Sequence, residues 1–197
     1  AMNKDILICG VGGQGTVLAS KILAAAAMDE GCPVHSAETI GMAQRGGSVT
    51  SHVRIGENAY SPLIPLGSAD MLLAFEPAEA VRNAPYLREG GFMVVNTVPT
   101  RPVTESLRPT GYDGSKMTAW LRDHCSCVPV DGEEACRPFG SMKFLNIILL
   151  GVSAGSGRLE LGRDALLRQI EKNVPARFLE QNLSAFRAGF DIGAAMP

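Results

Sequence analysis

The chain has 197 residues, of which 46% are hydrophobic and 19% charged, a balance that excludes a disordered or fibrous protein and allows a substantial core. Its 18 Lys and Arg against 20 Asp and Glu give a formal net charge of −2, so there is no basic excess of the kind that binds nucleic acid. No apolar run approaches the ~20 residues that cross a bilayer, and the odd count of 5 cysteines predicts reduced thiols in a cytoplasmic protein.

Strand and helix patterns alternate along the chain. Short apolar or alternating runs indicate strands, and apolar residues three or four apart indicate helices. In chain order, these patterns predict a strand at 5–9, a helix at 14–30, strands at 32–37, 48–55 and 70–75, a helix at 77–84, a strand at 92–96, a helix at 117–124, a strand at 127–130, and helices at 142–153, 163–172 and 179–190. This alternation predicts one α/β domain over residues 2–197, a three-layer α/β/α sandwich with a mostly parallel sheet.

Two segments modify this scheme. Turn residues at 56–58 follow the 48–55 strand and predict a hairpin whose second strand lies near Tyr60, which makes the sheet mixed. The segment 97–114 contains Pro99, Pro102 and Pro109, and we expect an irregular connection there.

A glycine-rich motif joins the first strand to the first helix. The residues Gly10-Val11-Gly12-Gly13-Gln14-Gly15 fit GxGxxG, in which the glycines allow a sharp turn, a close ligand approach and close packing of helix on strand. The helix N-terminus offers free N–H groups to an anion. With Glu38 placed to bind a ribose hydroxyl, this Rossmann-like first βαβ unit suits a stand-alone NAD(P)- or FAD-binding reductase. A tight turn without a ligand, in a structural dimerisation module, is the other interpretation.

Two features favour something other than a dinucleotide enzyme. Gln14 and Thr16 direct polar side chains into the space that a pyrophosphate would fill. Glu38 is followed by a polar loop up to Gly47, in which Gln44 and Arg45 supply planar hydrogen-bonding groups and Gly46 permits unusual backbone angles. Such a loop is typical of a contact with a partner chain or a phosphate.

Taken together, these segments resemble a known family. The segments 10–15, 38–39, 44–49 and 52–56 are similar to the gamma-type subunit or domain of 2-oxoacid:ferredoxin oxidoreductases. Within that family, 60–65 and 70–80 look most like the small beta subunit of indolepyruvate:ferredoxin oxidoreductase. The resemblance covers most of residues 3–100 and continues weakly to the C-terminal helix.

The resemblance implies a role in the coenzyme A (CoA)-dependent oxidative decarboxylation of aryl 2-oxoacids such as indolepyruvate, with ferredoxin as electron acceptor. It places thiamine diphosphate, Mg²⁺ and [4Fe-4S] clusters on a large alpha subunit. The present sequence has no CxxCxxCxxxCP run and no convincing thiamine diphosphate motif. We therefore expect this chain to bind no cofactor or metal, to be inactive alone, and to self-associate when apolar surface is left without its partner.

The loops expected to face CoA, substrate or the partner follow from the same resemblance, and no residue is expected to be catalytic. These site residues are Gly10, Gly12, Gly13, Gln14, Gly15, Thr16, Glu38, Gln44, Arg45, Gly46, Gly47 and Ser48.

Three smaller signals have plain interpretations. Cys125, Cys127 and Cys136 have no spacing typical of a zinc or cluster site, so ordinary thiols are expected. His52 shares a strand face with polar neighbours, and we expect that face to be solvated rather than covered by the partner. Glu76 ends a strand where α/β sheets bind ligands, or it complements the dipole of the next helix.

Overall fold

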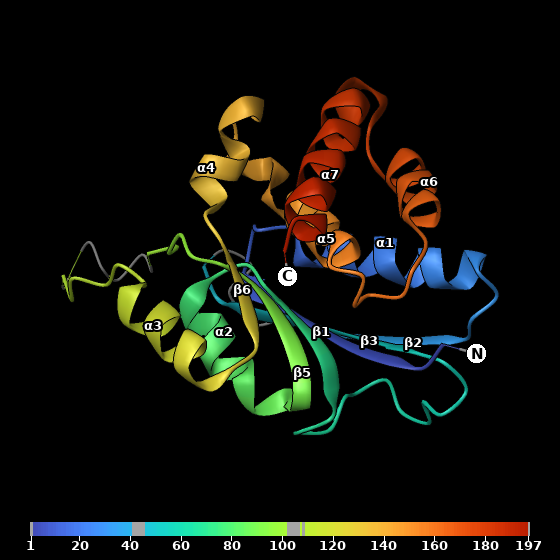
Figure 1. Cartoon of the computed structure of the whole chain (residues 1–197), viewed down its shortest axis with the longest axis horizontal. Coiled ribbons are helices and arrows are strands. Elements are labelled where there is room, and N and C mark those ends of the chain that lie inside the picture. Colours follow the sequence, from blue (N-terminus) through green and yellow to red (C-terminus); the bar gives the residue numbers. More distant parts are fainter. Residues whose placement is uncertain (1, 41–45, 102–106, 108, 197) are drawn as a thin grey trace.

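The computed structural model is a six-stranded sheet with helices on both faces (Figure 1). It describes residues 2–40, 46–101, 107 and 109–196. The strands are β1 (Lys4–Val11), β2 (Val34–Ile40), β3 (Ser48–Ile55), β4 (Ala69–Ala74), β5 (Leu87–Asn96) and β6 (Cys127–Val130). Their order is β2-β3-β1-β4-β5-β6, and within the described ranges only β3 runs antiparallel to its neighbours.

The helices form two layers of unequal size. On one face lie α1 (Thr16–Asp29), α5 (Leu145–Gly155), α6 (Arg163–Asn173) and α7 (Leu179–Ala194), with the short α4 (Gly132–Cys136) beside them. The other face carries α2 (Pro77–Asn83) and α3 (Ser115–His124). Short 3-10 turns occupy 84–86, 137–139, 142–144 and 176–178. The predicted three-layer sandwich with a mixed sheet is confirmed.

The central strands are apolar on both faces because both are covered. In β1, Ile6 and Ile8 belong to the core cluster under α1 and α5, whereas Leu7 and Cys9 belong to the cluster under α2 and α3. The period of two in a strand sends neighbouring residues to opposite faces. A strand buried in this way is a near-continuous apolar run, which is why it could be predicted from the sequence.

Four glycines let α5 and α7 pack with their backbones in contact. A Cβ at Gly151 or Gly155 would overlap a carbonyl oxygen of α7, and a Cβ at Gly189 or Gly193 would overlap one of α5. The two helices therefore approach more closely than any larger residue permits. Every residue from Leu145 to Ala154 is buried, so α5 is the central helix of this layer.

The predicted hairpin is wrong, because β3 has its partners elsewhere. It pairs with β1 over residues Ser48–Ile55 and with β2 on its other side, so β3 separates the two strands of the first βαβ unit. The segment after β3 cannot continue as a regular strand, since Pro62 and Pro65 lack N–H groups. It crosses β3 instead, on the face that carries His52 and Arg54, opposite the face that packs against α1.

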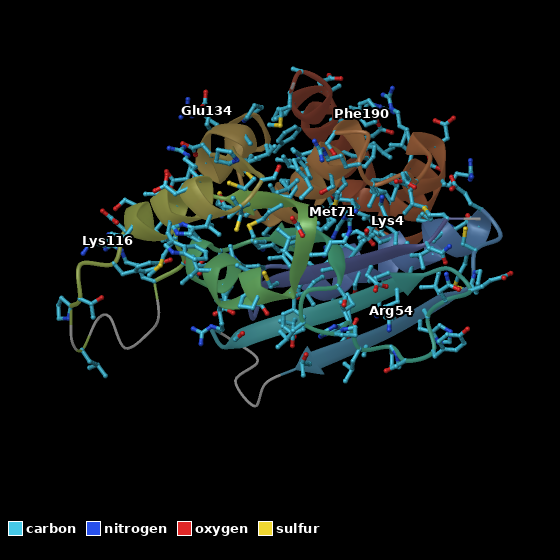
Figure 2. The ribbon with its side chains drawn as sticks, turned by 60° about the horizontal axis from the view of Figure 1, so that its bottom comes forward. Lys4, Arg54, Met71, Lys116, Glu134 and Phe190 are labelled. Carbon is cyan, nitrogen blue, oxygen red and sulfur yellow. The ribbon has the colours of Figure 1, made fainter. Side chains whose placement is uncertain are left out.

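Side chains of β3 hold this crossing segment in place. Arg54 donates to the carbonyl oxygens of Ser61 and Leu63 at 3.0 and 3.3 Å, and Figure 2 shows Arg54 on this strand. The N–H of Ile64 donates to Nδ1 of His52 at 3.1 Å. His52 is consequently only 5% exposed, and the expectation that it is solvated was wrong.

Two further boundaries differ from the predictions. β5 begins at Leu87 rather than at 92, and β2 extends to Ile40, so Glu38 and Thr39 belong to a strand rather than a loop. Within the described ranges, no individual helix has the length and apolar composition of a membrane span. Taken together, the helical segments Gly132–Phe139 and Met142–Gly155 do have that length and composition, but they are bent by 108° relative to each other.

Candidate functional site

The candidate site lies where the parallel strands end. The glycine loop after β1, Glu76 after β4 and the segment after β5 meet at this edge, the usual ligand-binding edge of an open α/β sheet. A hollow of about 530 Å³ opens there. Its lining is Gly13, Gln14, Gly15, Asn96, Val98, Pro99, Thr100, Arg101, Glu133, Met142, Lys143, Leu145 and Asn146.

The glycines of the loop are needed for close contacts and for left-handed backbone. Gly13 and Gly15 have φ of 98° and 82°, a region that favours glycine. A Cβ at Gly10 would lie 2.7 Å from Oε1 of Gln14 and 3.1 Å from Cβ of Phe75. Gln14 belongs to the same loop and Phe75 directly follows the neighbouring strand β4, so the first glycine serves the packing of the turn against this chain's own residues.

Gln14 occupies the centre of the turn. Its Oε1 accepts from the N–H of Val11 at 2.8 Å, and its Nε2 donates to the carbonyl oxygen of Phe75 at 2.9 Å and to Oγ1 of Thr100 at 3.1 Å. One amide thus joins the ends of β1 and β4 to the segment after β5. The expected polar side chain is present, but it binds protein groups. Thr16 is buried at the start of α1.

The second predicted loop meets the first, as far as it is described. The N–H of Gly12 donates to the carbonyl oxygen of Gly47 at 2.8 Å, and the N–H of Gly46 donates to that of Gly12 at 3.3 Å. The backbone that approaches Gly12 closely is therefore this chain's own. Gln44 and Arg45 lie outside the described residues.

Ser48 connects this loop to a buried carboxylate. Its Oγ donates to Oε2 of Glu79 at 2.6 Å, and Nε of Arg82 lies 3.3 Å from the other Glu79 oxygen. Glu79 is 5% exposed. The glutamate sits on α2, a helix that sequence reasoning did not connect with the site; its place in the first turn after Glu76-Pro77 was the available signal.

Glu76 acts as the N-cap of α2, which supports the plainer of its two interpretations. Its Oε2 accepts from the N–H of Glu79 at 3.0 Å, and its Oε1 accepts from the Tyr112 hydroxyl at 2.5 Å. Burial, followed by the hydrogen bond to Glu76, raises the pKa of Tyr112 above its usual range. Burial, followed by the charges of Glu79 and Glu76, likewise raises the pKa of Cys9. Both groups stay protonated at neutral pH and hold structure here.

Glu38 lies apart from the glycine loop. Its carboxylate accepts from Oγ of Ser20, in the second turn of α1, at 3.2 Å. Because β3 separates β2 from β1, Glu38 is displaced by one extra strand spacing of about 4.8 Å from the place of a ribose-binding acid beside β1. The structure brings together the residues at 10–16 and 46–48, and it does not bring Glu38 to them.

The cysteines form no metal centre in the part of the chain that the structure describes. All five are free, and no three His, Cys, Asp or Glu among the described residues are grouped to hold a metal ion. Burial raises the pKa of Cys125 and Cys127, and it raises that of Cys136 to about 11. These thiols are accordingly poor nucleophiles at neutral pH.

Comparison with known proteins gives a consistent result. Residues 5–192 match the family described as pyruvate ferredoxin/flavodoxin oxidoreductase. The chain is 37% identical over 195 residues to the indolepyruvate oxidoreductase subunit IorB of Methanothermobacter thermautotrophicus, covering 98% of this chain and 99% of that one.

Two solved structures share the fold. The gamma subunit of a keto/oxoacid ferredoxin oxidoreductase from Geobacter sulfurreducens aligns with a TM-score of 0.72 at 24% identity, over 98% of this chain and 99% of that chain. The 2-oxoglutarate:ferredoxin oxidoreductase of Magnetococcus marinus, solved with 2-oxoglutarate, CoA and succinyl-CoA, aligns with a TM-score of 0.76 at 20% identity. That alignment covers all of this chain but 32% of the other, so the same fold there is one part of a longer polypeptide.

Proposed function

We propose, from the premise that this chain belongs to the pyruvate ferredoxin/flavodoxin oxidoreductase family and is a small subunit of a 2-oxoacid:ferredoxin oxidoreductase, that its enzyme oxidises indolepyruvate and related aryl 2-oxoacids. The reaction is CoA-dependent oxidative decarboxylation, which yields an acyl-CoA, CO₂ and reduced ferredoxin. The observation that carries the proposal is the 37% identity to an indolepyruvate oxidoreductase subunit along nearly the whole of both chains.

We propose further that the cofactors belong to a large partner subunit. An iron–sulfur cluster needs cysteine thiolates, and the Mg²⁺ of thiamine diphosphate needs oxygen ligands. The described residues group no three His, Cys, Asp or Glu side chains around a metal position, and the five cysteines lie on β1, just before β2, at the end of α3, on β6 and on α4. When bound to the partner, the cofactors supply the electron sink and the path to ferredoxin. The free thiols suit a cytoplasmic complex of this kind.

In this proposal, the glycine loop and the loop at 44–48 present a surface to CoA, substrate or the large subunit. The contacts that support it are those of Gly12 with Gly46 and Gly47, and of Ser48 with buried Glu79, which fix the described part of both loops. Such fixed backbone can hold another molecule without a large ordering cost.

The test is co-expression of the chain with the large subunit. The complex should oxidise indolepyruvate with CoA and reduce ferredoxin, whereas the chain alone should show no turnover. A higher kcat/KM for pyruvate than for indolepyruvate would contradict the aryl substrate. Cofactor-dependent activity of the isolated chain would contradict the division of labour between the subunits.

Arg45→Ala tests the loop surface in that complex. If the loop meets CoA, substrate or the partner, the variant should raise a KM or weaken assembly by about tenfold, the loss of one charge-assisted contact. Arg187→Ala, on the exposed side of α7, is the matched control. Unchanged assembly and unchanged kinetics for CoA and the 2-oxoacid would refute the role of Arg45.

A further inference from the structure

Among the described strands, the sheet has one protected edge and one open edge. β6 has four residues with Pro129 among them, so its outer side is a poor template for another strand. β2 has seven residues, all in regular register with β3 from Val34 opposite Ile55 to Ile40 opposite Val49, and no described strand pairs with its other side. Figure 2 shows β2 as the outermost strand, beyond β3 with the labelled Arg54.

Three of the usual protections of an edge strand, namely proline, lysine and a bulge, are missing from β2. Proteins block open edges with prolines, bulges, lysines or a covering helix. The sequence of β2, Val-His-Ser-Ala-Glu-Thr-Ile, contains no proline or lysine, and its pairing with β3 has no bulge. Glu38 is its one acidic residue, and its side chain points to the α1 side, where it binds Ser20.

The hydrogen bonds to β3 show which backbone groups of β2 face outward. The N–H of Gly56 donates to the carbonyl oxygen of Pro33 at 2.8 Å. In an antiparallel pair the groups of alternate residues point toward and away from the neighbour. Odd-numbered residues therefore bond β3, and the N–H and C=O groups of Val34, Ser36, Glu38 and Ile40 point to the free edge.

We propose that β2 pairs antiparallel with β2 of a second copy of this chain, about a two-fold axis at Ala37, so that the two sheets join into one. In this register Ser36 pairs with Glu38 of the second copy and Val34 with Ile40, and all the outward backbone groups find partners. A two-fold axis at Glu38 would place two carboxylates opposite each other, which is destabilising. An axis at Ser36 would shorten the paired segment. Charge and length thus select one register.

The flank of α1 fits the same arrangement. A hollow of about 290 Å³ runs along the α1 side of this edge, and its lining includes Lys21, Ala24, Ala25, Met28, Ser36 and Glu38. Met28 is 64% exposed although it is large and apolar. Small alanines beside an exposed methionine let two α1 helices approach across the joined edge and bury that methionine. Lys21 and Glu38 give the flank one charge of each sign, so two copies meet without net like-charge repulsion. A surface that complements itself is what a two-fold dimer requires.

A disulfide at the axis tests the register. In a non-hydrogen-bonded antiparallel pair, directly opposite Cα atoms lie about 4.5 Å apart, within reach of a disulfide. Ala37→Cys should therefore give a covalent dimer under mild oxidation. Thr39→Cys, on the same face, is the control, because four residue steps separate the two copies of position 39 by about 13 Å. Both variants carry Cys32→Ser, which removes the thiol nearest β2.

The crosslinking is done on the full chain, alone and co-expressed with the large subunit. A dimer from Ala37→Cys and none from Thr39→Cys supports the proposal. Absence of crosslinking at both positions, equal crosslinking at both, or a crosslink from position 37 to the large subunit overturns it. The outcome is independent of the substrate assignment, because it reports only the pairing of this chain.

Sedimentation without added cysteines gives a second measurement. The wild-type chain should be dimeric, and Met28→Glu should raise the dimer dissociation constant at least about tenfold, since it buries a charge at the interface. Leu66→Glu, at a residue that is 67% exposed and lies two positions after Ile64 of the core cluster under α2 and α3, should leave the constant unchanged. A wild-type chain that stays monomeric at tens of micromolar overturns the proposal.

Discussion

Gln14 illustrates how a single amide can complete a glycine turn. It satisfies the N–H of Val11 and the carbonyl oxygen of Phe75 and also contacts Thr100, so three segments depend on it. In a dinucleotide site, a bound pyrophosphate lies against this kind of turn. Here the protein provides the polar partner itself, which explains why a motif of the dinucleotide type is compatible with another role.

Replacing Gln14 tests that structural role. Gln14→Ala should lower the free energy of unfolding by about 1–3 kcal/mol, because backbone groups at the ends of β1 and β4 lose their partner. Urea denaturation of the chain measures the change. Gln181→Ala, at an exposed glutamine of α7, should stay within about 0.5 kcal/mol of wild type. Equal effects of the two substitutions would contradict the assigned role.

His52 predicts a pH dependence of stability. Burial, followed by the charge of Arg54, lowers the pKa of His52 below its usual 6.5, and its Nδ1 must stay unprotonated to accept the Ile64 N–H. The unfolded chain therefore takes up this proton at a higher pH than the folded chain. The stability linked to His52 is complete above about pH 6.5 and is lost as the pH falls further.

The comparison is with His52→Asn, whose Oδ1 can accept the same N–H but does not titrate. Between pH 8 and pH 5, the free energy of unfolding should fall less in the variant than in wild type. Urea denaturation at several pH values provides the two curves. Parallel curves would show that the pH dependence arises elsewhere.

Among the elements, the contact of α5 with α7 gives the sharpest prediction. Here the expected change in unfolding free energy on replacing glycine by alanine has the opposite sign to the change that helix propensity predicts. Glycine to alanine inside a helix ordinarily stabilises by about 0.5–1 kcal/mol. At Gly189 the new Cβ would overlap the carbonyl oxygen of Ile148, and overpacking of this kind costs about 1–3 kcal/mol. Gly189→Ala should thus lower the unfolding free energy, whereas Ser184→Ala, exposed on the same helix, should raise it slightly. A stabilised Gly189→Ala chain would show that the helices can separate at little cost.

The positions of strands along the chain were easier to predict than the pairing of those strands in the sheet. The apolar run of β1 and the alternation of β3 are local patterns, and both strands form where expected. Which strands pair depends on contacts between distant residues, and the turn at 56–58 wrongly suggested a hairpin. β3 lies between β1 and β2 because its inward residues Val53 and Ile55 complete the core under α1. The glycine loop was likewise predicted from local spacing, whereas the partners Thr100, Glu79 and Tyr112 come from other segments.

At the scale of the whole molecule, the inserted strand changes what the glycine loop can bind. A dinucleotide site needs the loop after the first strand and an acidic residue on the strand beside it, both facing one ligand. Here the strand beside β1 is the antiparallel β3, and Glu38 on β2 binds Ser20 of α1. The same loop is closed by Gln14 and by the backbone at Gly46 and Gly47. The topology therefore favours a subunit surface over a nucleotide site.

This leads to a prediction for ligand binding. Titration of the full chain with NADH, NADPH or FAD, followed by fluorescence or calorimetry, should show no saturable binding up to about 1 mM, where the binding free energy falls below about 4 kcal/mol. Gln14→Gly, which opens the centre of the turn, is a useful second variant: without an acid beside β1 it should not gain binding either. The reductase interpretation would be restored if the wild-type chain bound one of these ligands with a micromolar dissociation constant and Glu38→Ala abolished the binding. Only a ligand that reaches both the loop and β2 would depend on that carboxylate.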